Sequence, residues 1–331
     1  MAKNEPIKNP ESEDAFGGAE SETGSVLHKQ LEKYAKAKCR SSDMSDYIQS
    51  EYPSERKLAD KLHDCGSFLV FRDYYRISEL RLHRASFCKK HLLCPFCAIR
   101  RAMKAIAVYE ERVQEVLKDN PKLKLYMVTL TVKNGESIDD RHAHLTNSKK
   151  KYTAARRRHI NNPNRSAVEF NKALGGVYSI EHKRGKNSGL WHPHSHEIWI
   201  CEDEPDKYRL SEEWQRITGD SKIVDVRPMT DGESRLKGFL EVFKYALKFS
   251  DMELSDNWTA YKAMNGKRLV NPFGVLRGLE IPEDLEDDPI EHEPYMELYY
   301  NYFRNAGYSL AKAEHHDFDP WTVTRDSYEE E

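Results

Sequence analysis

Two kinds of hydrophobic pattern run along the chain, and together they predict an α+β fold. Apolar residues at three- and four-residue spacing predict helices, whereas short runs of β-branched and large apolar residues predict strands. The expected helices are 26–38, 54–63, 97–118 and 234–249, with a polar helix around 149–158. The expected strands are 68–71, 80–82, 124–132, 175–181, 192–200 and 222–228. Because a short turn separates 175–181 from 192–200, these two strands are expected to pair antiparallel.

The pattern divides the 331 residues into four segments. Residues 1–25 are polar and are expected to be disordered. An N-terminal module of helices and cysteines follows over 26–118, a central domain over 119–252, and an extension with an acidic tail over 253–331. No apolar run is long enough to span a membrane, and no signal peptide is visible. We therefore expect a cytoplasmic protein without a membrane partner.

The strand 192–200 carries imidazoles at every second position. Because side chains alternate across a strand, His192, His194 and His196 point to one face. Two or three converging imidazoles make a site for a divalent transition metal, with His192 the least certain member. Antiparallel pairing with the preceding strand can place Glu181 opposite these rings as a further ligand.

The helix 234–249 places three reactive side chains on one face. Glu241, Tyr245 and Lys248 follow one another at i, i+4 and i+7. Its expected apolar stripe is Leu236, Phe239, Leu240, Phe243 and Leu247. A metal beside a carboxylate, a phenol and an ammonium group is suited to attack on a phosphodiester.

Four cysteines predict a structural zinc site in a ribbon-like module. Cys94 and Cys97 form a Cys-x-x-Cys turn, and Cys65 and Cys88 flank the two strands that precede it. Four thiolates complete a tetrahedral zinc site. His91 is an alternative to one cysteine, and a redox pair of Cys94 and Cys97 is the alternative to zinc.

Charge is distributed unevenly and permits a polyanionic partner. Residues 281–331 hold fifteen acidic residues against three basic ones, so residues 1–280 carry a net charge of +9 in a chain whose total is −3. This asymmetry is compatible with nucleic-acid binding. The candidate phosphate contacts are Arg100, Arg101, Lys149, Lys150, Lys151, Arg156, Arg157 and Arg158, and a solvated helix face is the alternative for each group.

Taken together, the region from Cys65 to Gly278 resembles rolling-circle plasmid replication initiators of the pC194/pUB110 type, in the HUH endonuclease superfamily. The motifs are the cysteine quartet, the strand Thr129-Leu130-Thr131, His192-Pro193-His194-Ser195-His196 and Glu241-x-x-x-Tyr245 with Lys248. The resemblance implies an HUH-type antiparallel sheet and makes 119–252 the nuclease domain. One departure is Ser195, because the family has a bulky apolar residue between the paired histidines. Ser195 and Glu197 thus share a face where packing is expected.

The resemblance also implies roles for individual residues. His194 and His196 would coordinate catalytic Mn²⁺ or Mg²⁺, Tyr245 would be the nucleophile, and Glu241 would activate water for the terminating cleavage. Lys248 could neutralise charge on the phosphate. The expected product is a 5′-phosphotyrosine link at the plasmid origin, and the expected partners are duplex and single-stranded hairpin DNA and a host helicase.

Two other functions stay open from the sequence. A single-tyrosine HUH transposase would use related chemistry, although the cysteine module and Glu241 argue against it. A non-catalytic, zinc-dependent DNA-binding regulator would form no covalent adduct and would be indifferent to Tyr245→Phe.

Overall fold

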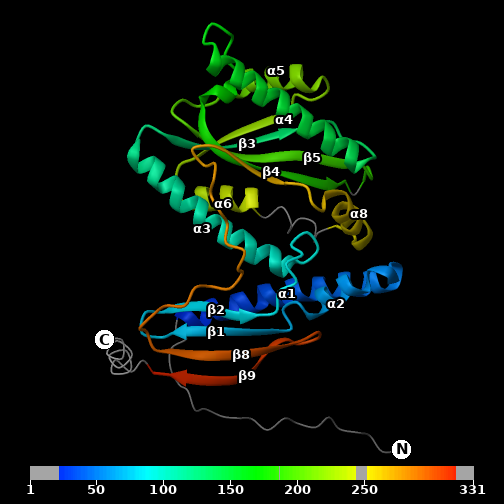
Figure 1. The fold of residues 1–331 in the computed structure, drawn as a ribbon, viewed down its shortest axis with the longest axis vertical. Coiled ribbons are helices and arrows are strands. Elements are labelled where there is room, and N and C mark those ends of the chain that lie inside the picture. The colour runs from blue at the N-terminus through cyan, green and yellow to red at the C-terminus, as the bar shows by residue number, and fades with distance from the viewer. Residues whose placement is uncertain (1–21, 186, 244–251, 318–331) are drawn as a thin grey trace, which may run out of the picture.

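The α+β class is confirmed by a computed structural model, which describes residues 22–185, 187–243 and 252–317. It contains a five-stranded and a four-stranded antiparallel sheet, each flanked by helices (Figure 1). In the described part of the chain, no helix combines the length and the apolar character needed to cross a membrane.

The five-stranded sheet has the order β6-β3-β5-β4-β7, so the histidine strand lies at its centre. Its strands are β3 (Lys124–Thr131), β4 (Ala173–Arg184), β5 (Trp191–Cys201), β6 (Val224–Met229) and β7 (Val270–Gly274). Each neighbouring pair is antiparallel. The hairpin expected between 175–181 and 192–200 is the β4–β5 pair, which extends a few residues beyond those bounds.

The two faces of this sheet are covered by different helices (Figure 1). We call the face under α3 (Pro95–Asp119) and α6 (Gly232–Phe243) the near face. The far face carries α4 (Ile138–Asn161) and α5 (Lys207–Thr218). Alternation along β5 supplies both cores, because Ile198 packs with the α3 and α6 residues and Trp199 packs with those of α4 and α5.

The buried face of α6 differs from the expected stripe. Phe239 and Phe243 are buried as expected, but Leu236 and Leu240 are exposed. The other two buried positions of α6 are Gly238 and Val242, which the expected stripe did not include. The helix is therefore rotated slightly from the predicted orientation. Leu247 lies outside the described residues, as do Tyr245 and Lys248.

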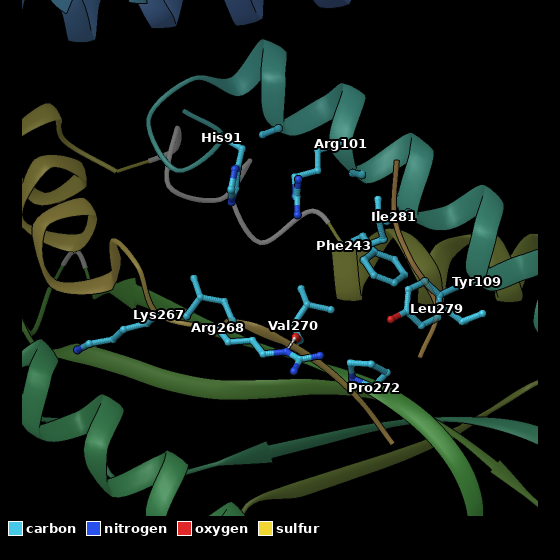
Figure 2. Close-up of a pocket in the computed structure, with 14 residues that line it drawn as sticks. His91, Arg101, Tyr109, Phe243, Lys267, Arg268, Val270, Pro272, Leu279 and Ile281 are labelled. Carbon is cyan, nitrogen blue, oxygen red and sulfur yellow. Dashed lines mark hydrogen bonds between the residues drawn. The ribbon is translucent and has the colours of Figure 1, made fainter. Parts of the chain in front are cut away.

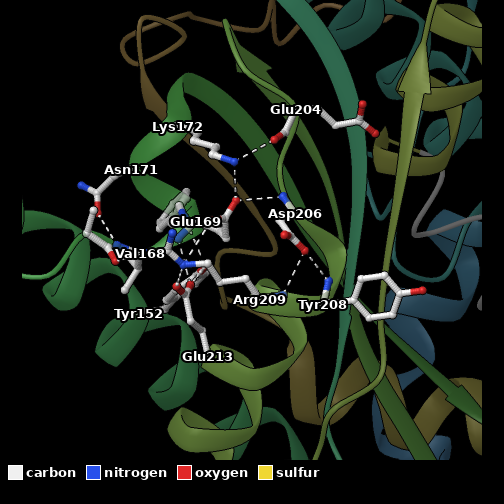
Figure 3. Close-up of polar contacts among 12 residues, drawn as sticks. Tyr152, Val168, Glu169, Asn171, Lys172, Glu204, Asp206, Tyr208, Arg209 and Glu213 are labelled. Atoms are coloured by element: carbon white, nitrogen blue, oxygen red, sulfur yellow. Dashed lines mark hydrogen bonds and ion pairs between the residues drawn. The ribbon is translucent and has the colours of Figure 1, made fainter.

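A buried polar network fixes α5 on the far face (Figure 3). The Glu213 carboxylate accepts hydrogen bonds from the Tyr152 hydroxyl and from the backbone N–H of Glu169, both at 2.9 Å. Glu169 lies in the 3₁₀ helix η2 (Glu169–Lys172), and its carboxylate accepts from the backbone N–H of Asp206, the N-cap of α5, at 2.8 Å. The carboxylates thus tie α4, η2 and α5 together.

The four-stranded sheet is built from both ends of the chain. Its order is β2-β1-β8-β9, and Phe68 of β1 faces Asn301 of β8. Its strands are β1 (Phe68–Tyr74), β2 (Glu79–Ala85), β8 (Tyr295–Phe303) and β9 (Gly307–His316). The remaining elements are α1 (Glu22–Glu51), the 3₁₀ helix η1 (Pro53–Glu55), α2 (Arg56–Asp64) and α8 (Leu254–Met264). The segment 253–331 thus contributes strands to both sheets, and residues 22–25 of the predicted disordered segment belong to α1.

Candidate active site and cysteine cluster

The pairing of β4 with β5 brings a carboxylate and two imidazoles together on the near face. Glu181 faces His194 directly, and Ser179 faces His196. On β3, the other strand paired with β5, Thr129 faces His196, and the Thr129 hydroxyl lies 3.3 Å from His196 Nδ1. Directly opposed residues in an antiparallel pair project from the same face, so this register alone assembles the cluster.

The distances in this cluster fit a divalent ion. Glu181 Oε2 lies 3.2 Å from His194 Nε2 and 3.0 Å from His196 Nε2. Ligand atoms at right angles around an ion, each about 2.1 Å away, are separated by about 3 Å. Glu181 is buried, whereas the His194 and His196 side chains retain 15% and 13% exposure. A buried carboxylate with two partly exposed imidazoles is a mixed oxygen and nitrogen donor set that can bind a divalent metal.

The third histidine of the strand does not join the cluster. His192 projects from the same face as His194 but pairs with Lys183, one step nearer the end of the hairpin. Its ring lies against Gly185, where an added Cβ would come within 2.3 Å of His192 Nε2. The group with ligand atoms within 4.8 Å of one another is Glu181, His194 and His196.

A second carboxylate approaches from α6. Glu241 Oε2 lies 3.9 Å from His196 Nε2, and the Glu241 side chain is 36% exposed. The helix that carries the expected general base therefore places its carboxylate beside His196. The predicted nucleophile Tyr245 and the predicted Lys248 lie outside the described residues, so their roles stay predictions.

Ser195 and Glu197, the polar residues of β5 that point to the far face, belong to a buried network around an ion pair of Glu197 with Lys149. Glu197 accepts hydrogen bonds from Lys149 Nζ at 2.7 and 2.8 Å, from Ser195 Oγ at 2.7 Å and from Trp199 Nε1 at 2.8 Å. Lys149 is 2% exposed and Glu197 is fully buried. Burial lowers the pKa of Lys149, and the charge of Glu197 opposes that shift. Sequence reasoning missed this pair, although two polar residues on a packed face required a buried partner.

The four cysteines also converge. Cys65 follows the last residue of α2, Cys88 follows β2, Cys94 is the N-cap of α3, and Cys97 lies in its first turn. The Sγ–Sγ separations are 3.5 Å for Cys65–Cys94, 3.5 Å for Cys65–Cys97 and 3.6 Å for Cys88–Cys97.

These separations fit one tetrahedral ion. Four sulfurs placed 2.3 Å from a zinc ion are about 3.8 Å apart, close to the observed spacing. Hydrogen bonds from neighbouring thiols lower the pKa of Cys94 although burial opposes its ionisation, and hydrogen bonds to the same neighbours together with burial raise that of Cys65. Burial disfavours bare thiolates at Cys65, Cys94 and Cys97, and a divalent cation bound by the four sulfurs would offset the cost of their ionisation. His91 is not among the four clustered ligands.

The predicted phosphate contacts divide into buried and exposed cations. Arg100 is 2% exposed and is bound by Asp287, by the Leu285 carbonyl oxygen and by the Tyr34 hydroxyl, while Lys149 is buried against Glu197. These two predictions are corrected, because neither side chain reaches the surface. Arg156 donates to the carbonyl oxygens of Phe170 and Ala173. Exposed cations on α4 are Lys150, Lys151, Arg157 and Arg158, and Arg101 of α3 is partly exposed.

Comparison with known proteins reveals one consistent relationship. A family described as "Replication protein" matches residues 79–301. The chain is similar to "Protein rep" of Streptococcus pneumoniae serotype 2 (strain D39 / NCTC 7466), with 30% identity over 262 residues that cover 74% of this chain and 77% of the relative. It is also similar to "Protein rep" of Lactiplantibacillus plantarum, with 27% identity over 72% of this chain and 78% of the relative. No solved structure matches the chain.

Proposed function

The chain belongs to the replication protein family, and from this premise we propose that it initiates plasmid replication by nicking and rejoining one strand of the origin. The observation that carries the proposal is the position of Glu241, 3.9 Å from His196 in a cluster with Glu181 and His194. This arrangement supports phosphodiester chemistry because it combines a site for a divalent ion with a separate carboxylate. The family match also favours an initiator over a transposase.

In the proposed reaction, the Tyr245 hydroxyl attacks the scissile phosphorus. The Tyr245 Oη–P bond forms, the bond from phosphorus to the 3′ oxygen breaks, the phenolic proton is released to solvent, and the 3′ oxygen takes up a proton. Glu181, His194 and His196 would hold the divalent ion. When bound, this ion would act as a Lewis acid on the phosphate.

Glu241 is proposed as the general base of the terminating step. Its partly exposed carboxylate can accept a proton from water while the water oxygen attacks the 5′-phosphotyrosine phosphorus and Tyr245 Oη leaves. Lys248 is proposed to neutralise charge on the phosphate. A host helicase as partner stays a prediction from the resemblance.

Two surfaces are proposed to serve this reaction without contributing to the chemistry. The exposed cations Lys150, Lys151, Arg157 and Arg158 lie on α4, on the far face, so they are suited to hold flanking duplex DNA rather than the cut strand. The cysteine cluster is proposed to bind structural Zn²⁺.

The decisive experiment is formation of a covalent adduct. The protein is incubated with labelled origin oligonucleotides and Mn²⁺ or Mg²⁺, and adducts that resist denaturation are separated on a gel. Wild type and Tyr208→Phe, which alters an exposed tyrosine on the far-face helix α5, should both give the adduct. Tyr245→Phe should not, and Glu241→Ala should nick but terminate poorly. An adduct with Tyr245→Phe would contradict the assignment, and no adduct with wild type would favour a non-catalytic regulator.

The zinc proposal is tested by elemental analysis of the purified protein. One zinc per chain is expected, with loss of zinc in Cys97→Ser. The matched control is Cys201→Ser, because Cys201 is buried but lies outside the cluster. Equal zinc content in Cys97→Ser and wild type would contradict the assignment.

A further inference from the structure

A cavity of about 350 Å³ opens on the near face, beside the candidate active site. Its walls come from α3, from the end of α6 and from the segment 267–272, which includes the start of β7. Figure 2 shows His91 and Arg101 reaching from the α3 side toward the sheet, while Lys267 and Arg268 lie on the sheet side of the same space. This volume is at the lower end of the range for small-ligand pockets and has room for one nucleotide.

The strand register fixes the distance from this cavity to the imidazoles. Val270, which lines the cavity, faces Ser179 of β4, and Ser179 faces His196 of β5. The three residues therefore lie in one row on the near face. Val270 is two strand spacings from His196, or about 10 Å. A single DNA strand with its phosphate at the imidazoles can therefore reach the cavity with an adjacent nucleotide.

The lining combines positive charge with apolar surface. Arg101, Lys267 and Arg268 supply cations, whereas Tyr109 and Phe243 belong to the apolar lining and are themselves only 2% and 4% exposed. None of the described lining residues is acidic. Lys267 is paired with Asp139 at 2.8 Å, but neither arginine has a carboxylate partner in the described part of the chain. Arg268 Nε donates to the Val270 carbonyl oxygen at 3.1 Å, and its guanidinium carries further N–H donors. Arginines beside an apolar cavity are suited to single-stranded nucleic acid, because they can contact its phosphates while a base enters the cavity.

The position and the lining together point to one occupant. We propose that this cavity binds a nucleotide of the cut strand next to the scissile phosphate, with Arg101 and Arg268 on its phosphates and the base in the apolar part of the cavity. The inference rests on the proposed function, because it assigns the strand that enters the cavity. It also separates two DNA surfaces: single strand on the near face and duplex on α4 of the far face.

The first test measures binding of a fluorescein-labelled single-stranded oligonucleotide of mixed sequence and about 16 nucleotides. The variant Arg101→Gln with Arg268→Gln is compared with Lys118→Gln with Lys122→Gln, which removes two exposed cations at and just beyond the far end of α3. We expect the cavity variant to bind about tenfold more weakly or worse, and its salt dependence to fall by about 1.4 in slope. The control variant should bind within about twofold of wild type. Equal losses in the two variants, or no loss in either, would overturn the inference.

The second test uses the wild-type protein and so does not depend on variant folding. An oligonucleotide carrying 5-iododeoxyuridine is irradiated in the complex, and the crosslinked peptides are identified by mass spectrometry. Crosslinks to the cavity-lining peptides of α3 or of the segment 267–272 are expected, and crosslinks confined to peptides of α4 would overturn the inference.

The two proposals can fail separately. If wild type forms no adduct but the cavity variant still loses single-strand binding, the nicking function fails and the cavity assignment stands. If wild type forms the adduct and the cavity variant binds and cuts like wild type, the cavity assignment fails alone. If wild type binds no single strand at all, both are overturned.

Discussion

Two buried carboxylates on neighbouring strands have opposite surroundings. Glu197 of β5 points to the far face and receives four hydrogen bonds, all from protein donors on Lys149, Ser195 and Trp199. Glu181 of β4 points to the near face, where its neighbours are the rings of His194 and His196 and, at 3.5 Å, Lys183 Nζ. The far carboxylate is satisfied by the chain, whereas the near one is surrounded by groups that can themselves bind a metal. This difference distinguishes a structural ion pair from a site.

The physical reason lies in the cost of burying charge. A buried ion pair is stable only when its geometry is good and its remaining hydrogen-bonding capacity is satisfied. Three donor groups, which make four hydrogen bonds, meet that condition around Glu197. Around Glu181, the imidazole nitrogens of His194 and His196 can bind a metal ion together with the carboxylate, so the near face is suited to a ligand.

Removal of the near carboxylate should have the largest effect, and it should act on activity. Glu181→Ala is expected to lower the rate of Mn²⁺-dependent oligonucleotide cleavage at least about a thousandfold, because a bound divalent ion supplies several kcal/mol of transition-state stabilisation. Its thermal unfolding without metal should remain near that of wild type. A variant that cleaves normally would show that Glu181 is not a metal ligand.

Removal of the far cation should act on stability instead. Lys149→Met leaves Glu197 buried and unpaired, so the free energy of unfolding should fall by about 3–5 kcal/mol in urea titrations. Adding Glu197→Gln to this variant should restore much of the loss, because the unpaired charge is then absent. If the double variant is no more stable than Lys149→Met, the pairing does not account for the destabilisation.

Two buried serines on the paired strands sharpen the same contrast. Ser195 donates to the Glu197 carboxylate, whereas the Ser179 hydroxyl has no hydrogen-bond partner in the described part of the chain. A hydrogen bond to a charged group contributes about 1.5–3 kcal/mol, so Ser195→Ala should lower the unfolding free energy by that amount. Ser179→Ala should change it by less than about 0.5 kcal/mol. Equal effects would argue against the special role of Glu197.

The smallest expected effect concerns two buried histidines on the far face with ring nitrogens that lack hydrogen-bond partners in the described part of the chain. His142 Nδ1 and both ring nitrogens of His182 have no hydrogen-bond partner among the described residues, and their rings lie 5.2 Å apart. Burial, with a contribution from Lys267, lowers the pKa of His142 to about 4. Between that value and about 6.5, the unfolded chain binds a proton that the folded protein excludes, so stability is fully present above pH 6.5 and falls as pH decreases.

The measurement is the free energy of unfolding as a function of pH. Wild type should lose about 1–2 kcal/mol more than His142→Leu between about pH 6.5 and pH 5. His28→Gln, which alters an exposed histidine on α1, is the control and should follow wild type. Parallel pH profiles for wild type and His142→Leu would contradict the assignment.

Local patterns in the sequence were sufficient to predict the cluster of Glu181, His194 and His196 and the convergence of the cysteines. Alternating histidines identified β5, the short turn placed Glu181 opposite them, and the Cys-x-x-Cys motif located the start of α3. Each of these features depends on residues that are close in sequence or paired across one hairpin. Register and backbone geometry then fix where the side chains meet.

Contacts between distant segments could not be predicted in this way. Lys149 belongs to a run of cations that predicts an exposed helix face, whereas its burial depends on Glu197 in another element. Arg100 likewise meets Asp287 from the acidic segment. No local pattern encodes such partners. The pairing of β8 with β1 was missed for the same reason, because only the folded chain brings Phe68 beside Asn301.

That last pairing has a consequence for biosynthesis. During translation, β1 leaves the ribosome long before its partner β8 is synthesised. The edge of β1 that pairs with β8 in the four-stranded sheet therefore stays open during most of translation. Prematurely terminated chains that lack β8 would keep this edge exposed and should aggregate rather than accumulate as half-active fragments. Complete synthesis is thus a condition for a finished N-terminal sheet.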